Sequence, residues 1–266
     1  MTRGSRTRRG MASMLGPRRG PMIWISAALV ILVLTVVLLL GLRAWPRSGQ
    51  AAAASTDQSA RQPLFVLGDS FAQNANFQDQ IVRAMGDRQV TVDGVGSSSL
   101  DEQRLRFQGQ INGWKSLLVI LDGGLTDPDA VRPVSAIVDM LDRGCGRWLY
   151  IEPPHTVEGG PIGSPSYTRQ TALVEAVQKR WPDHFVPLIQ ELRNGASPSP
   201  QDQESVEKGW TPASLRQEDD PLHLNAEGYR ILVQTISRAV AKLDASPNRP
   251  CSGAAMDQMQ AATENP

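Results

Sequence analysis

After residue 63 the chain alternates short apolar runs with longer segments in which apolar positions recur every three or four residues. Short apolar runs bounded by glycine or polar turns predict buried strands, and the three-to-four spacing predicts amphipathic helices. The expected strands are 64–67, 90–92, 116–121, 147–151 and 184–186. The expected helices are 77–85, 100–111, 134–141, 167–180 and 226–243. This alternation predicts an α/β domain with a parallel sheet covered on both faces, with ligands at the carboxyl ends of the strands.

One apolar stretch, residues 22–42, is longer than any of these and carries no charge. It is long enough to cross a hydrocarbon core of about 30 Å as a helix. Six arginines precede it and only Arg43 and Arg47 follow closely, so the positive-inside rule places the N-terminus in the cytoplasm. We therefore expect a single-pass plasma-membrane protein with an extracytoplasmic domain. A cleaved signal peptide, with 51–53 as cleavage site, is the alternative and would also export the domain.

The expected organisation has five parts. Residues 1–21 form a basic cytoplasmic segment, 22–42 the transmembrane helix and 43–62 a linker rich in Ala, Ser, Gln and Arg. These are followed by the folded domain, residues 63–245, and a tail, 246–266, that has lost the apolar period and is expected to be disordered.

The segment 194–218, inside the domain, is rich in Pro, Ser and Gln and predicts a loop, either substrate-facing or mobile. Trp210 within it is a candidate substrate contact, or else packs under the loop. Cys145 and Cys251 are the only cysteines. In an oxidising compartment they either pair or remain as two thiols, because sequence separation does not say whether their Cβ atoms approach.

The formal net charge of zero hides an asymmetry. Residues 1–49 hold eight arginines and no acidic residue, which leaves 19 basic and 27 acidic residues in the rest, a net charge of −8. An acidic domain argues against nucleic acid as a partner, because that binding depends on clustered Lys and Arg. Three separated histidines and two distant cysteines give no metal-ligand spacing, and no glycine-rich nucleotide loop is present. We expect no metal and no cofactor; the sequence gives no oligomeric state.

Ser70 lies in Gly68-Asp69-Ser70-Phe71, directly after the first expected strand. A serine at such a strand-to-helix turn exposes its hydroxyl above the sheet, as a nucleophile requires. Gly-Asp-Ser is also ordinary turn and helix-cap chemistry, so this motif alone leaves both readings open.

Asp220 and His223 lie three residues apart before the last expected helix. Serine is a poor nucleophile at its free pKa, so it needs an imidazole to take its proton and a carboxylate to orient that imidazole. Of the three histidines, only His223 has an acidic residue so placed. His155 and His184 are expected to have surface or structural roles.

Together these motifs resemble the SGNH hydrolase family, also called GDSL esterases and lipases. Its first block is similar to residues 67–70, and its last, Asp-x-x-His followed by a glycine-containing helix start, is similar to 220–228. The resemblance spans about residues 63–243. It implies a three-layer α/β/α sandwich around a five-stranded parallel sheet, of flavodoxin-like type. It also implies that Ser70 is the nucleophile, His223 the general base and Asp220 its orienting carboxylate.

The middle blocks of the family match less well. The resemblance implies an oxyanion hole formed by the N–H of Ser70, the N–H of a glycine after the second strand, and an Asn side chain after the third. Gly96 is the preferred glycine, with Ser97 as the alternative. After the third strand the chain has Asp122-Gly123-Gly124 and no asparagine. Gly124 or Thr126 is a candidate substitute; loss of one oxyanion donor typically costs about 10²–10³ in rate.

Asp69, beside the expected nucleophile, is a further candidate for substrate contact, together with Trp210. Three functions remain open. The first is an extracytoplasmic serine esterase that acts through an acyl-enzyme. The second is an O-acyltransferase that modifies a polysaccharide or glycolipid of the cell envelope, in keeping with export and the missing asparagine. The third is a catalytically inactive SGNH-fold binding domain. The expected substrate is an acyl ester, glycan or lipid of the envelope.

Overall fold

In the computed structural model, the described residues are 61–122, 129–144 and 146–246. The expected cytoplasmic segment 1–21, the expected membrane span 22–42 and all but the end of the expected linker 43–62 lie outside them. Both cysteines and the expected tail from residue 247 also lie outside them. Among the described residues, no helix combines the length and apolar character that crossing a bilayer requires.

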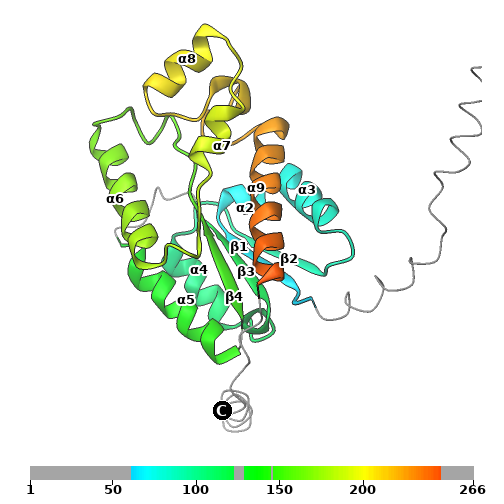
Figure 1. Ribbon diagram of the computed structural model, residues 1–266. Helices are drawn as coiled ribbons and strands as arrows, with labels where there is room; N and C mark the ends of the chain where they lie inside the picture. Colours follow the sequence, from blue (N-terminus) through cyan, green and yellow to red (C-terminus); the bar gives the residue numbers. More distant parts are fainter. Residues whose placement is uncertain (1–60, 123–128, 145, 247–266) are drawn as a thin grey trace, which may run out of the picture. The chain divides into compact units, whose positions relative to one another are not determined.

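A five-stranded sheet forms the centre of the domain (Figure 1), and the prediction of a parallel sheet is confirmed. Its strands are β1 (Leu64–Gly68), β2 (Val90–Gly94), β3 (Leu117–Leu121), β4 (Arg147–Ile151) and β5 (Phe185–Val186). All pairs are parallel, in the order β2-β1-β3-β4-β5. Gly68 at the end of β1 pairs with Gly94 of β2 and with Leu121 of β3. The loops that follow these three strands therefore leave the sheet at one level.

Helices connect the strands and cover both faces of the sheet. They are α2 (Ser70–Gln73), α3 (Ala75–Met85), α4 (Leu100–Gln108), α5 (Val131–Gly144), α6 (Pro165–Arg180), α7 (Ile189–Asn194), α8 (Pro200–Glu207) and α9 (Ala226–Ala245). Two 3₁₀ turns, Gly113–Lys115 and Ala213–Leu215, complete the described elements. Several helices begin at a side-chain cap; at α4, Ser99 and Glu102 form a reciprocal capping box that satisfies two otherwise unpaired backbone N–H groups.

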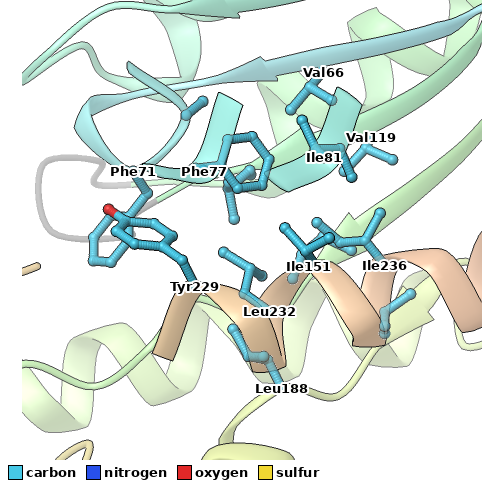
Figure 2. Close-up of a cluster of buried hydrophobic side chains, with 14 of the residues drawn as sticks. Val66, Phe71, Phe77, Ile81, Val119, Ile151, Leu188, Tyr229, Leu232 and Ile236 are labelled. Atoms are coloured by element: carbon cyan, nitrogen blue, oxygen red, sulfur yellow. The ribbon is translucent and has the colours of Figure 1, made fainter. Parts of the chain in front are cut away.

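Strand β1 shows how the apolar sequence builds two cores. Successive strand residues point to opposite faces, so Leu64 and Val66 enter one cluster while Phe65 and Leu67 enter the other. The first cluster receives side chains from α3, α7 and α9, and the second from α4, α5 and α6. Figure 2 shows the first, in which Val66 and Val119 of the sheet face Ile81 and Ile236. The sheet is thus the middle layer of three.

The segment 194–218 differs from the expected loop, because α8 occupies residues 200–207. Ser199 caps this helix at Asp202 N, and Pro200 takes the first helical position, where its missing N–H has no cost. Asp202 is itself buried and accepts hydrogen bonds from the N–H of Ser197 at 2.6 Å, the N–H of Ser214 at 2.7 Å and the hydroxyl of Ser214 at 2.5 Å. These bonds fold the polar segment around one carboxylate, which an apolar period does not reveal.

Candidate active site

Ser70 is the first residue of α2, immediately after the end of β1. Asp69 Oδ1 accepts a hydrogen bond from Phe71 N at 3.0 Å, so the Asp69 side chain caps α2. Asp69 is buried, whereas Ser70 is partly exposed. Gly68 allows the turn its tight fit, because a Cβ there would meet Leu121 O at 2.5 Å. The serine thus stands on a closely packed turn while remaining accessible.

Arg106, on α4, holds the turn between β1 and α2 in place. The sequence did not predict this contact. Arg106 Nη2 donates to Gly68 O at 3.1 Å, and its Nε donates to Asp93 Oδ1 at 3.0 Å. Val95 N donates to the same Gly68 carbonyl at 3.2 Å. The end of β1 is therefore joined to α4 and to the chain that leaves β2. Nothing in the helical pattern of residues 100–108 distinguishes this arginine from its neighbours.

Asp220 and His223 contact each other directly. His223 Nδ1 donates to Asp220 Oδ2 at 2.5 Å, while Asp220 Oδ1 accepts from Leu222 N at 3.0 Å and from His223 N at 3.3 Å. Burial raises the pKa of Asp220, but these hydrogen bonds and the imidazole outweigh it and lower the pKa below its usual value. An ionised carboxylate only accepts hydrogen bonds, so a neutral His223 carries its proton on Nδ1 and leaves the Nε2 lone pair available.

The His223 ring packs against Phe71, with 5.3 Å between ring centroids and 49° between planes. Phe71 is the residue after Ser70, so the segment that carries His223 lies against the turn that follows β1. The structure therefore brings His223 beside α2.

The segment that carries His223 is attached to residues 214–217. Gln217 N donates to His223 O at 3.0 Å, and Gln217 Nε2 donates to Leu224 O at 3.2 Å. Arg216 and Leu224 form an isolated antiparallel bridge. The position of the imidazole thus depends on the segment folded around α8.

Asn225 links this arrangement to α9. Its Oδ1 caps the helix by accepting from the N–H groups of Glu227 and Gly228, each at 3.0 Å. Its Nδ2 donates to the carbonyls of Ser214 at 2.8 Å and Arg216 at 3.1 Å. One amide therefore joins the start of α9 to the turn after α8.

Gly96, the preferred second oxyanion donor, lies next to Ser70, but its N–H already has a partner. It donates to Gln73 Oε1 at 2.8 Å. A Cβ built on Gly96 would stand 2.7 Å from that oxygen and 4.0 Å from Ser70 Cβ. Ser97, the alternative donor, has φ 59°, a left-handed conformation that is uncommon for a serine.

The other two candidates for the oxyanion hole, Gly124 and Thr126, lie outside the described residues. Asp122, at the end of β3, is buried and accepts from Gln103 Nε2 at 3.3 Å. The same nitrogen lies 3.4 Å from Ser98 O. The end of β3 therefore carries a buried carboxylate that is hydrogen-bonded to α4.

His155 and His184 occupy packed positions. His155 is buried beside the Tyr167 ring with Nδ1 3.3 Å from Gly209 O, and burial lowers its pKa. His184 stacks on Trp148 with 4.3 Å between ring centroids, and its Nδ1 donates to Trp148 O at 2.9 Å. Both rings are thus engaged in packing and in backbone hydrogen bonds.

Trp210, the candidate substrate contact, is half-buried. Its Nε1 donates to Gly160 O at 2.8 Å, and Lys208 Nζ lies 4.8 Å from the ring centroid. The indole thereby ties the end of α8 to the loop before α6. Within the described residues, no cluster of three or more His, Cys, Asp or Glu side chains has an arrangement that would hold a metal ion.

Tyr229, in the first turn of α9, packs against Phe77 with 6.2 Å between ring centroids (Figure 2). Its hydroxyl is buried and has no hydrogen-bond partner among the described residues. Burial, with the negative charges of Asp69 and Asp220, raises the pKa of Tyr229 above its usual value. The buried phenol therefore keeps its proton.

Comparison with known proteins places the fold. The chain matches no known family model, and no curated protein matches its sequence. Among solved structures it is similar to the C-terminal catalytic domain of peptidoglycan O-acetyltransferase A (OatA) of Streptococcus pneumoniae with a methylsulfonyl adduct. That likeness has a TM-score of 0.50 and 13% identity, and it covers 70% of this chain and 97% of the other. A second similar structure is the psychrotrophic esterase EstA of Pseudoalteromonas sp., inhibited by monoethylphosphonate. Its TM-score is 0.48 and its identity 13%, and the match covers 70% of this chain and 100% of the other. At this identity the first likeness shows the fold alone, an α/β domain around an all-parallel five-stranded sheet.

Proposed function

We propose that this chain is an SGNH-type serine enzyme that cleaves acyl esters through an acyl-enzyme. One observation carries the proposal: the Asp220–His223 pair, joined at 2.5 Å, packs its imidazole against Phe71, the neighbour of Ser70. A histidine oriented by a carboxylate, beside a serine at the end of a parallel strand, is the combination that nucleophilic acyl transfer needs.

In the proposed reaction, Ser70 Oγ forms a bond to the acyl carbon and its proton passes to His223 Nε2. The electron pair of the carbonyl bond moves to oxygen. When this intermediate collapses, the ester C–O bond breaks, and the leaving alcohol takes the proton from His223. Water then attacks the acyl-enzyme with His223 as base, which releases the acid and restores Ser70. Asp220 remains ionised throughout and stabilises the imidazolium.

The second candidate replaces water with a hydroxyl of an envelope glycan or lipid. It fits the family resemblance and the fold shared with a peptidoglycan O-acetyltransferase domain. We also propose that residues 22–42 anchor the chain in the plasma membrane with the domain outside. Protease treatment of intact cells tests that placement, since a domain that remains protected until the cells are lysed would contradict it.

The proposal is tested by incubating the full chain with 4-nitrophenyl acetate and, separately, with a fluorophosphonate. We expect Ser70→Ala to remove both turnover and labelling. Ser166, another partly exposed serine in the first turn of a helix, provides the matched control, and Ser166→Ala should retain both. Turnover that survives in Ser70→Ala would refute the proposal; a wild-type chain with neither turnover nor labelling would favour the inactive binding domain.

Hydrolysis and transfer are separated by adding an N-acetylglucosamine oligomer as acceptor. A transferase should give an acylated oligomer at the expense of free acid, at an unchanged rate of alcohol release if acylation limits turnover. If no acceptor competes with water, the esterase reading stands.

A further inference from the structure

We infer that the side-chain amide of Gln73 supplies the oxyanion donor that the absent asparagine leaves vacant, an inference that rests on the proposed function. The observation behind it is the hydrogen bond from Gly96 N to Gln73 Oε1 at 2.8 Å. Because a backbone N–H only donates, the atom that faces Gly96 is the amide oxygen. The Gln73 NH₂ group, with two protons to donate, therefore points away from Gly96.

The amide lies beside the expected nucleophile. The position that a Cβ of Gly96 would take is 3.8 Å from Gln73 Cδ and 4.0 Å from Ser70 Cβ. Ser70 and Gln73 are separated by three residues on α2, a spacing that places two side chains on one face of a helix. Gln73 is also exposed, so an entering substrate reaches it.

The backbone of Gln73 is fixed on several sides, and the hydrogen bond from Gly96 N holds its side-chain amide. Gln73 N donates to Asp69 O at 3.0 Å, and Gln73 O accepts from Gln78 Nε2 at 3.1 Å. The end of β2 presses on the same residue, because a Cβ on Gly94 would lie 2.3 Å from Gln73 N. Donors that need no rearrangement contribute most to stabilising developing charge.

The hydrogen bond from Gly96 also strengthens the donor. When the amide oxygen accepts a hydrogen bond, electron density is drawn from the amide nitrogen and its N–H groups become better donors. Gly96 N–H then acts on the oxyanion through Gln73. This differs from the family arrangement, in which the corresponding glycine N–H contacts the oxyanion itself.

Two substitutions in the full chain separate this role from a purely structural one. Gln73→Met keeps the length of the side chain, removes its donors and frees Gly96 N–H. Gln73→Glu keeps an acceptor for Gly96 N–H and removes the donors. Both should lower kcat for 4-nitrophenyl acetate by about 10²–10³ with a small change in KM. Gln190→Met and Gln190→Glu are the matched controls, since Gln190 is an exposed helical glutamine with one side-chain partner, Asn194; both should retain wild-type kcat.

A thionoester substrate gives a readout that misfolding would not move. Sulfur is a poor hydrogen-bond acceptor, so wild type should prefer the oxoester strongly, and Gln73→Met should reduce that preference. If Gln73→Met keeps or exceeds wild-type kcat, or loses activity with an unchanged preference, Gln73 only holds the loop and the inference is overturned. Absence of wild-type turnover and labelling would instead refute the proposed function, and the inference with it.

Discussion

Replacing Asp244 with alanine should destabilise the domain far more than removing an exposed carboxylate. Asp244, in the last turn of α9, accepts from Arg88 Nη2 at 2.8 and 2.9 Å and from Arg147 Nη2 at 3.0 Å. The Arg88 side chain is only 4% exposed. Arg147 Nη1 also donates to Leu243 O at 2.6 Å. One carboxylate is therefore paired with two guanidinium groups, one of them almost fully buried.

Removing one member of a buried ion pair costs about 3–5 kcal/mol, because the charge of the other member stays buried without a partner. In Asp244→Ala the charge left behind is that of Arg88. Asp244 itself is 23% exposed, so water reaches part of the vacated space, and we expect the lower end, about 3 kcal/mol. For a domain of this size that corresponds to a fall in Tm of roughly 6–12 °C. Urea unfolding followed by tryptophan fluorescence gives the free energy of unfolding directly.

Asp79→Ala is the matched control. Asp79 faces Arg83 at 3.7 Å in a pair whose side chains are 72% and 78% exposed, and such pairs contribute about 0–1 kcal/mol. Arg88→Met combined with Asp244→Leu should recover part of the loss, since no charge then remains at the Arg88 position. If Asp244→Ala shifts the urea midpoint no more than Asp79→Ala, the ion cluster does not hold α9 in place and the reasoning is wrong.

Three further outcomes are expected. Asp220→Asn should lower kcat by about 10⁴ by disfavouring the Nδ1-protonated tautomer of His223, while Asp219→Asn, on the exposed neighbour, should leave the pH–rate profile unchanged; equal losses would contradict the assignment. Tyr229→Phe should leave the free energy of unfolding unchanged or raise it by about 1 kcal/mol, because it removes a buried hydroxyl without a partner among the described residues; a loss above that amount would show that the hydroxyl is bonded. Burial raises the pKa of Asp202, but hydrogen bonds from Ser214 and Ser197 outweigh it and lower the pKa. Its contribution to stability is therefore present above about pH 4 and lost as pH falls through the lower folded pKa, so Asp202→Asn should flatten the acid side of a stability–pH curve, and an unchanged slope would count against this.

The sheet could be predicted because its strands are buried on both faces. Leu64 to Leu67 and Leu117 to Leu121 are continuous apolar runs, and such runs occur where helices cover both sides of a parallel sheet. The order of the strands could not be predicted, since an apolar strand pairs equally well with several neighbours. Helix α8 was not predicted because it has no apolar face that repeats along the sequence. It depends instead on hydrogen bonds to Asp202.

Part of the candidate site could likewise be predicted from the sequence, and part could not. The contact between Asp220 and His223 was predictable because the two residues are close in sequence and have complementary chemistry. Gln73 and Arg106 were not, because their roles depend on which backbone atoms lie opposite them after folding. The α2 turn that carries Gln73 is only four residues long, too short to produce a recognisable period. The catalytic roles of Ser70, His223 and Asp220 remain predictions.

The four hydrogen bonds of the Asn225 side chain have a consequence for the interpretation of mutational screens. This amide lies two residues from the imidazole and connects two segments whose mutual position orients it. A substitution here would lower turnover although the residue never meets an acyl group. Loss of activity after substitution of Asn225 would thus look the same as loss of a catalytic side chain. Only a measurement of folding would distinguish the two cases.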